Sequence, residues 1–413
     1  MLRDNTRPQT ARHAGNTRDC AGRALLFLAP GDVSKGRVEP ISWMRTCEAY
    51  AGAGLDVTLA TIQMRRPDAI PVADVWRHFG IDECFRLAVF PTPLDHDVSV
   101  RKFRLWAGSV GGFLALQMAA RAVRSRRAVP IVHSRSPVLL APFVAVRRTL
   151  PRSRRPLLIF ETHALPTDAN AWIVKGVDLV VCNSQKLSRD IQERFGLPST
   201  RVLHAPLPPF NPVQPQPRSG ARNRLGLDDD SVIACYTGKM TREYSEFFLR
   251  TAEEAARLVQ RFRLMLVGGN PEILEWTRRR VAELGLGDVV VIAGFVAPAD
   301  VEQHQSAADV LLYHMPESVG IFPYTTPAKA YEYQAMRRPI VATDFPLFNE
   351  VFGEDGERAI RVADRTPVGF AQGIAAAVQL GNRGIAMTER AAVFVDGRTW
   401  ASRSAAILNA VGV

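Results

Sequence analysis

The sequence predicts an α/β protein built from two Rossmann-like, doubly wound domains that face a central cleft. Short apolar runs alternate with helical patterns in both halves of the chain. Six prolines between residues 206 and 218 interrupt that alternation once. The length of 413 residues exceeds one ordinary domain and suffices for two separate cores.

The first half is predicted to form a parallel sheet covered by helices on both faces, because its strands are apolar almost throughout. Strands are expected at 24–29, 56–61, 85–90, 130–133, 157–161, 179–183 and 201–205, and helices at 41–53 and 187–195.

The second half repeats the pattern. Strands are expected at 232–237, 263–267, 289–293, 310–314 and 339–343, and helices at 243–260, 272–284 and 328–336. Ligands of such sheets bind at the carboxyl ends of the strands. The predicted parts are a disordered arm (1–22), a first domain (23–205), a Pro-rich linker (206–222), a second domain (223–390) and a final helix that packs back (391–413).

The positive charge is confined to the first half. The chain carries 52 Lys and Arg against 41 Asp and Glu, a net charge of +11. Residues 1–220 hold 31 basic and 17 acidic side chains, and the remainder hold 21 and 24. An anionic partner such as a membrane surface or nucleic acid explains this excess, and so does a solvated, arginine-rich surface.

An apolar stretch at 105–120 lies between cations. At sixteen residues it is shorter than the ~20 needed to span a bilayer. We favour a buried helix with basic ends over a contact with a membrane surface. The flanking cations are Arg101, Lys102, Arg104, Arg121, Arg124, Arg126 and Arg127.

The sequence predicts neither a metal site nor a nicotinamide site. The five cysteines are scattered without metal or redox spacing, and Cys47, Cys182 and Cys235 are expected to be buried thiols in a reducing cytoplasm. Gly268 and Gly269 lack the remainder of a dinucleotide fingerprint.

The most specific stretch is YTTPAKAYEYQAMRRPIVA, residues 324–342. Thr326 before a proline is typical of a helix start, whose free N–H groups bind phosphate. Lys329 in the first turn would reach the same anion, and Glu332 would accept the hydroxyls of a ribose. We therefore assign Thr325, Thr326, Lys329 and Glu332 to a nucleotide donor, against the alternative of an ordinary amphipathic helix.

Two further groups follow predicted strands. In YTGKMTREYS, Gly238 permits close backbone approach, and Lys239 and Arg242 would neutralise a diphosphate, unless they are merely solvated cations. Arg135 and His163 follow neighbouring strands of the first half. We expect these two side chains to converge on the cleft and to be catalytic.

Together these motifs resemble the GT-B fold glycosyltransferases of family 4, over roughly residues 24–413. TPAKAYEYQAMRRPIVAT is similar to the subgroup pattern SPxKxxEYMAxGxPIVAT. VDLVVCNSQKLSRDI resembles the segment that closes the acceptor domain, and DVVVIAGFV resembles a strand of the donor domain. RTWASR, residues 398–403, resembles the start of the last helix, which often packs back on the first domain.

The resemblance implies roles for some residues and shows departures at others. Glu332 matches the second glutamate of the E-x7-E motif, which holds the donor ribose, and Lys239 falls on a diphosphate-binding arginine. The partner lysine of the family falls on Tyr244, so we expect Arg242 to substitute. The first glutamate falls on Tyr324, and Glu317 is the expected replacement.

The resemblance also implies an acceptor site in the first domain and a donor site in the second. A frequent acceptor-domain histidine of the family falls on Arg135, while His163 matches a second one. The implied reaction is retaining transfer from a nucleoside-diphosphate sugar to a sugar, lipid-linked or small-molecule acceptor, in glycan, glycolipid or polysaccharide biosynthesis.

The implied enzyme needs no cofactor and no metal, and has no nucleic-acid partner. It is expected in the cytoplasm or at the inner face of the membrane. Two alternatives remain. A nucleotide-sugar epimerase uses the same architecture, and the departures at Tyr244 and Tyr324 fit a non-catalytic partner protein.

Overall fold

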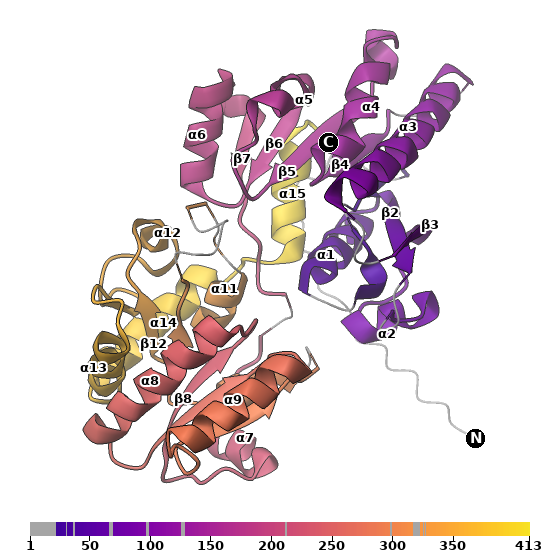
Figure 1. Cartoon of the computed structure of the whole chain (residues 1–413). Coiled ribbons are helices and arrows are strands. Elements are labelled where there is room, and N and C mark those ends of the chain that lie inside the picture. Colours follow the sequence, from indigo (N-terminus) through magenta and orange to yellow (C-terminus); the bar gives the residue numbers. More distant parts are fainter. Residues whose placement is uncertain are drawn as a thin grey trace, which may run out of the picture.

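The computed structural model contains two α/β domains, one above the other in Figure 1. It describes residues 22–29, 31–35, 38–65, 69–95, 99–124, 129–210, 213–297, 300–316, 323–324, 326 and 328–413. Several residues singled out in the sequence lie outside these ranges: the arm up to residue 21 with Cys20, Arg126, Arg127, Glu317 and Thr325.

The first domain is built on a seven-stranded parallel sheet of order β3-β2-β1-β4-β5-β6-β7. Its strands are β1 Ala24–Leu28, β2 Asp56–Arg65, β3 Arg86–Asp95, β4 Ile131–Ser134, β5 Leu157–Thr162, β6 Leu179–Cys182 and β7 Val202–His204. Its helices are α1 Val38–Gly52, α2 Val75–Phe79, α3 Val100–Arg124, α4 Pro137–Arg147, α5 Ala171–Gly176 and α6 Gln185–Phe195.

The second domain is built on a six-stranded parallel sheet of order β10-β9-β8-β11-β12-β13. Its strands are β8 Val232–Thr237, β9 Phe262–Val267, β10 Val290–Gly294, β11 Val310–Tyr313, β12 Ile340–Thr343 and β13 Ile360–Val362. The helices of this half are α7 Arg218–Leu225, α8 Arg242–Leu258, α9 Pro271–Glu283, α10 Val301–Ala307, α11 Ala328–Ala335, α12 Asn349–Phe352, α13 Pro367–Val378 and α14 Asn382–Val395.

Each sheet is buried on both faces, as its apolar strands require. Side chains that alternate along β5 enter different cores, because Ile159 faces one apolar cluster and Leu158 and Phe160 face the other. The central strands of the second domain divide in the same way between two clusters. The two doubly wound domains predicted from the sequence are therefore confirmed.

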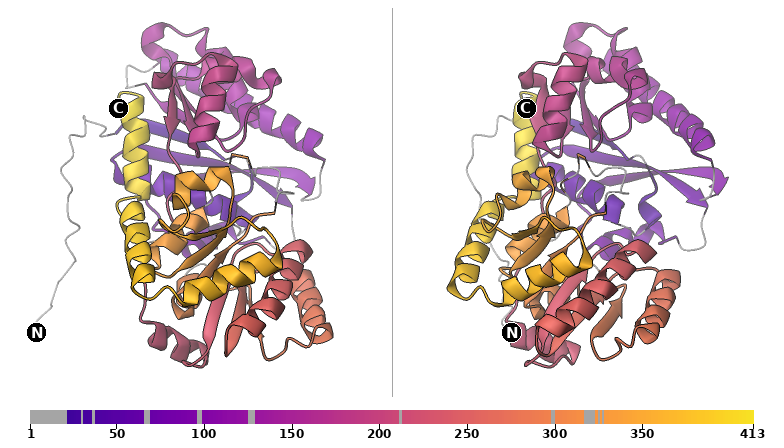
Figure 2. Two further views of the ribbon diagram at one scale, coloured as in Figure 1. Left: turned by 90° about the vertical axis from the view of Figure 1, so that its left-hand side faces the viewer. Right: turned by 60° about the vertical axis from the view of Figure 1, so that its left-hand side comes forward.

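The chain ends in the first domain. After α14 it crosses back, and α15 Trp400–Ala410 lies along the first domain, in yellow in Figure 2. Ile407, Leu408 and Val413 are part of the core formed by β1 and α1. The Trp400 indole N–H donates to the Pro209 carbonyl at 2.8 Å and so holds the chain between the domains.

Two predicted boundaries fall inside helices. The expected linker 206–222 contains the start of α7, and the expected boundary at 390 lies within α14. α7 has little apolar surface, and its anchor is the buried Arg222. That guanidinium donates to the Ala307 and Ser231 carbonyls at 2.9 Å and pairs with Asp309 at 2.5 Å. Apolar periodicity does not reveal a helix that is fastened by an arginine.

The preferred prediction for 105–120, a buried helix with basic ends, is right about the helix and wrong about the burial of one face. α3 buries Ala107, Gly111 and Ala115 along one stripe, whereas the side chains of Leu105 and Leu116 are 67% and 64% exposed. A Cβ at Gly111 would lie 2.9 Å from the Leu139 carbonyl oxygen, so glycine is what lets α3 approach α4 so closely. The helix is amphipathic, and its outer face is partly apolar.

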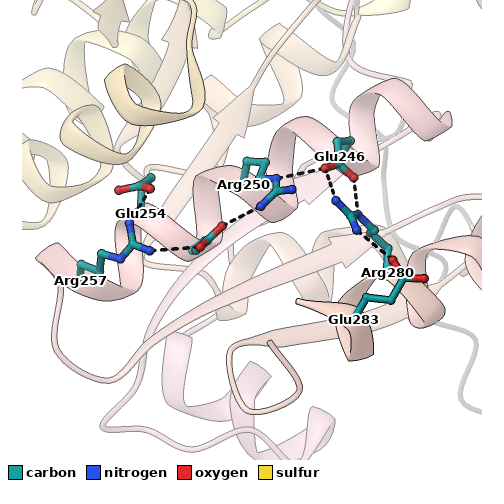
Figure 3. Close-up of polar contacts among 7 residues, drawn as sticks. Glu246, Arg250, Glu254, Arg257, Arg280 and Glu283 are labelled. Carbon is teal, nitrogen blue, oxygen red and sulfur yellow. Dashed lines mark hydrogen bonds and ion pairs between the residues drawn. The ribbon is translucent and has the colours of Figure 1, made fainter. Parts of the chain in front are cut away.

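Ion pairs fasten α8 to α9 on the surface of the second domain (Figure 3). The Arg280 guanidinium on α9 lies 2.8 Å from Glu246 on α8, and Arg250 binds the same carboxylate at 3.1 Å. Exposed pairs of this kind contribute about 0–1 kcal/mol each. These ion pairs hold α8 against α9, whose first turns are joined by the pair of Arg242 with Glu272.

Candidate functional site

The Lys329 ammonium lies among tyrosine rings at the carboxyl end of the second sheet. Its Nζ is 4.2 Å from the ring centre of Tyr236 on β8, 5.1 Å from Tyr313 on β11 and 6.0 Å from Tyr333 on α11. Within the described residues no carboxylate pairs with Nζ. Burial lowers the pKa of Lys329 to about 7, although Glu332 opposes this shift. An anion would supply the missing countercharge.

Glu332 follows Lys329 on α11 and faces the chain that joins the domains. Its Oε1 accepts a hydrogen bond from the Phe210 backbone N–H at 3.1 Å. Burial raises the pKa of Glu332, and the bond from Phe210 and the charge of Lys329 oppose the rise. Lys329 and Glu332 therefore lie close together, as the sequence predicted.

The loop after β8 brings Gly238 against Lys329. A Cβ at Gly238 would lie 3.1 Å from Lys329 Nζ, and the backbone there has φ of +135°. Lys239 is exposed, and its carbonyl accepts from the Tyr236 hydroxyl at 2.8 Å. Arg242 starts α8, but its exposed side chain pairs with Glu272 on α9 at 3.0 Å. The structure thus unites Gly238 with Lys329 and places the Arg242 guanidinium against α9.

Residues before α11 bind the first domain. The Thr326 hydroxyl donates to the Asn183 carbonyl, directly after β6. The Tyr324 hydroxyl donates to Asp190 on α6 at 2.9 Å. Glu350 on α12 accepts from the backbone N–H of Gln185 at 2.7 Å, at the start of α6. Tyr324 therefore joins the domains, in place of the glutamate that the family motif has there.

In the first domain, Arg135 and His163 meet at a buried carboxylate. Glu161 on β5 is fully buried, with Oε1 2.6 Å from the Arg135 guanidinium and 3.1 Å from His163 Nε2. Oε2 lies 3.2 Å from His133 Nε2 and 3.0 Å from the guanidinium of Arg403 on α15. We call these five residues the Glu161 cluster.

The Glu161 cluster carries one excess positive charge. Burial opposes ionisation of Glu161, but the charges of Arg135 and Arg403 outweigh burial and hold its pKa well below the ordinary value. Burial lowers the pKa of both His133 and His163, and Arg135 lowers that of His163 further. Both imidazoles are neutral near pH 7. His163 Nε2 lies within hydrogen-bond distance of Glu161, and His133 Nδ1 lies 3.0 Å from the Tyr50 hydroxyl.

Sequence reasoning assigned no role to Glu161 and Arg403, the two residues that organise this cluster. Glu161 was visible as a charged residue inside an otherwise apolar strand, LLIFET. Arg403 gave no local signal, because it reaches Glu161 from the far end of the chain. The Arg403 Nε also donates to the Ala205 carbonyl at 3.1 Å, where the first domain ends.

The interpretation that the sequence holds no D-x-D pattern for a metal-bound diphosphate is wrong as to the sequence, because residues 228–230 are three consecutive aspartates. These aspartates precede β8, at the opposite end of the strand from Lys329, and Asp228 pairs with Arg261 at 2.6 Å. Among the described side chains, no group of three His, Cys, Asp or Glu is placed to hold a metal ion. Cys47, Cys182 and Cys235 are buried free thiols, as expected.

Each domain carries a cationic group at the carboxyl end of its sheet, and each group is suited to an anionic ligand. The Glu161 cluster follows β4 and β5 of one sheet, and Lys329 adjoins the end of β8 in the other. Direct contacts from Tyr324, Thr326 and Glu350 join the two domains beside this region. Positive groups fixed in advance stabilise negative charge that develops on a leaving group.

Comparison with known proteins identifies the second domain. Residues 231–379 match the family described as "Glycosyl transferases group 1". They form a glycosyl transferases group 1 domain. The matched segment contains Gly238, Lys329 and Glu332.

Two curated relatives of this chain are glycosyltransferases. The D-inositol 3-phosphate glycosyltransferase of Kineococcus radiotolerans is 27% identical over 260 residues, which is 57% of either chain. A GDP-mannose-dependent alpha-(1-6)-phosphatidylinositol monomannoside mannosyltransferase of Mycolicibacterium smegmatis is 27% identical over 222 residues, 52% of this chain and 50% of that one. The chain spans about half the length of these relatives.

Solved structures share the whole fold. A glycosyltransferase of Rickettsia africae has a TM-score of 0.68 at 15% identity, covering 94% of this chain and 98% of its own. HepE of Anabaena, solved in complex with UDP, has a TM-score of 0.66 at 15% identity with the same coverage. The predicted GT-B fold is confirmed by these likenesses.

The fold does not separate the two enzyme classes considered from the sequence. A protein of Listeria monocytogenes described as a UDP-N-acetylglucosamine 2-epimerase has a TM-score of 0.61 at 10% identity, covering 95% of this chain and 96% of its own. A likeness at this identity carries the architecture alone.

Proposed function

We propose that this protein is a glycosyltransferase that moves a sugar from a nucleoside-diphosphate sugar to an acceptor, with retention of configuration. The observation that carries the proposal is the Lys329 ammonium, enclosed by tyrosines and without a carboxylate partner among the described residues, one helical turn from Glu332. Both residues lie in the group 1 domain. A diphosphate and a ribose match this pair in charge and in hydrogen bonding.

In this proposal the second domain binds the nucleotide, and the first domain orients the sugar and the acceptor. Lys329, with Gly238 and the start of α11, receives the diphosphate and stabilises the charge that it gains on leaving. Lys239 and Arg242 also bind the diphosphate, once the Arg242 guanidinium has left Glu272 for a phosphate oxygen. Arg135 and His163 orient the sugar and the acceptor from the opposite side. The acceptor attacks on the face from which the nucleotide departs, so that no protein nucleophile is required.

Ribose recognition is tested at Glu332. Glu332→Gln keeps the oxygen that accepts from Phe210 but removes the charge, so nucleotide binding should weaken by roughly 1–3 kcal/mol. Calorimetry with UDP and GDP measures this change. Glu275→Gln, on the exposed side of α9, is the matched control and should bind like the wild type. If the Glu332 variant bound every nucleotide as tightly as the wild type does, this would contradict the assigned role.

We also propose that catalysis is independent of metal. Charge on the diphosphate would be met by Lys329, Lys239, Arg242 and the start of α11. Sugar transfer should therefore continue in excess chelator. Transfer that stops in chelator and resumes with magnesium or manganese would overturn this part of the proposal.

The epimerase alternative is separated by its product. An epimerase would release an altered nucleotide sugar, or the free sugar, without an acceptor, whereas a transferase requires the acceptor for turnover beyond slow hydrolysis. Product analysis with and without acceptor distinguishes the two. Protein that neither transfers nor hydrolyses any donor would favour the non-catalytic alternative.

We further propose that the acceptor is lipid-linked and that the protein reaches it from the membrane surface through α3. Within the described residues, every helix is too short or too polar to cross a bilayer. The outer face of α3, however, presents Leu105, Phe113 and Leu116, each more than half exposed, with Arg101 and Arg104 beside them. A half-apolar helix flanked by cations suits an interface with anionic lipid.

A further inference from the structure

A second basic site lies on the first domain, away from the Glu161 cluster. A hollow of about 500 Å³ opens where α4 ends and where β6 and β7 begin, at the amino ends of the strands. The Glu161 cluster lies at the opposite, carboxyl ends. The hollow is lined by five cations and one acid: Arg147, Arg148, Arg155, Lys175, Arg201 and Asp178.

Backbone carbonyls accept hydrogen bonds from three of the arginines, and two of these three, Arg155 and Arg201, bind no carboxylate of the hollow. The guanidinium of Arg147 donates to the Gly176 carbonyl at 3.2 Å, and that of Arg155 to the Leu150 carbonyl at 3.1 Å. The Arg201 guanidinium donates to the Lys175 carbonyl at 2.9 Å. Carbonyl groups fix the orientation of a guanidinium but leave its full charge in place.

Asp178 neutralises only one of the five cations. Its Oδ1 lies 2.6 Å from Arg147, and its Oδ2 accepts from the Leu158 backbone N–H at 2.8 Å. Both oxygens are therefore occupied. Arg147, Arg155 and Arg201 are half-buried, while Arg148 and Lys175 are exposed at the rim. The hollow retains an excess of four positive charges.

We propose that this hollow is a binding site for a phosphate group. Guanidinium groups in fixed orientation bind tetrahedral oxyanions through paired N–H donors, and lysine adds a mobile charge. The volume admits a phosphate ester with a small organic part. The ligand is a soluble phosphate compound or the headgroup of an anionic lipid, since both present the same chemistry. The site is independent of the proposed transfer reaction.

Inorganic phosphate and pyrophosphate are the first probes. Titration is carried out by calorimetry on full-length Lys329→Met protein, so that the proposed donor site is weakened equally in every protein compared. Removing two rim charges with Arg148→Gln/Lys175→Gln should weaken binding about tenfold or more and leave the half-buried arginines intact. Arg278→Gln/Arg279→Gln, exposed on α9, removes the same charge elsewhere and should bind like the parent.

Vesicles distinguish a lipid source. Flotation with phosphatidic acid or with phosphatidylcholine alone is compared in a Leu105→Ser/Leu116→Ser background, which disables the outer face of α3. Binding of free phosphate without vesicle recruitment identifies a soluble ligand, whereas recruitment by phosphatidic acid that the rim variant loses identifies a headgroup. If neither phosphate, pyrophosphate nor phosphatidic acid vesicles distinguishes the rim variant from its parent, the proposal is wrong.

Discussion

The environment of Lys329 opposes its charge in the absence of a ligand. Burial among Tyr236, Tyr313 and Tyr333 lowers its pKa to about 7, against about 10.5 in an unfolded chain. The unfolded state therefore binds more protons between these two values, and stability should rise with pH across that window. The same ammonium lowers the pKa of His314, which burial already depresses, to about 3.

Lys329→Met should consequently raise the melting temperature at pH 7 by several degrees while abolishing nucleotide binding. The gain should shrink as pH rises from about 7 toward about 10.5, because more of the wild-type amine is then neutral in the unfolded state as well. Differential scanning calorimetry across pH 6–10 measures this. Lys186→Met is the control. It removes a lysine that pairs with Asp190 at 2.6 Å, so it should lower stability slightly and spare nucleotide binding. A destabilised Lys329 variant at pH 7 would contradict the electrostatic account.

Sequence patterns predicted some elements and not others, and the difference lies in how each element is stabilised. β5 and β8 are apolar runs that bury both faces, so local composition predicted them to within a residue. α7 and α10 escaped because their buried side chains are polar. Arg222 is satisfied by carbonyls of the loop before β8 and of Ala307 at the end of α10, and Gln305 binds Thr237 at 3.1 Å. β13 has only three residues, too few for a period.

The candidate site divides in the same way. Gly238, Lys329 and Glu332 were found because a strand end and a helix start are local signals. The tyrosines around Lys329 come from β8, β11 and α11, and only the folded sheet brings them together. Glu161 and Arg403 are 242 positions apart, so no spacing in the sequence predicts their contact.

The exposed apolar side chains on the outer face of α3 predict that the protein binds membranes. Full-length protein should float with anionic vesicles at low salt and detach as salt screens the cations. Leu105→Ser/Leu116→Ser should reduce recovery several-fold, because apolar burial contributes about 25 cal/mol per Å². Leu258→Ser/Ile385→Ser is the control. It changes two comparably exposed side chains of the second domain, so vesicle recovery should stay at the wild-type level. Equal recovery on neutral and anionic vesicles would indicate that the basic residues serve solubility alone.

At the scale of the molecule, the two domains are joined by polar contacts and by a shared helix. Thr326 of the second domain binds the Asn183 carbonyl after β6, and Glu350 binds the start of α6. Glu332 and Trp400 hold the connecting chain at Phe210 and Pro209. α15 follows α14 of the second domain but packs in the core of the first. The relative placement of the Glu161 cluster and Lys329 therefore depends on how α15 docks.

Arg403 should control that docking, because it places a fully buried cation against a fully buried carboxylate. Arg403→Met removes one partner of the pair and the donor to the Ala205 carbonyl, so it should cost roughly 3–5 kcal/mol of stability. Glu161 would keep Arg135, but its pKa should rise toward the ordinary value, because one of the two cations that lower it is gone. Stability that ionised Glu161 contributes is lost as pH falls through its folded pKa, and that loss should begin at higher pH in the variant.

A double-mutant cycle with Glu161→Gln tests whether the ion pair itself is responsible. Residues in direct contact should show a coupling of at least about 1 kcal/mol in thermal or urea unfolding, and hydrogen exchange should speed up throughout α15 in either single variant. Arg390→Met, on α14, loses bonds to two exposed carbonyls and serves as the control. Additive effects with unchanged exchange in α15 would mean that Ile407 and Leu408 dock the helix by apolar contact alone, and that Arg403 does not position the Glu161 cluster.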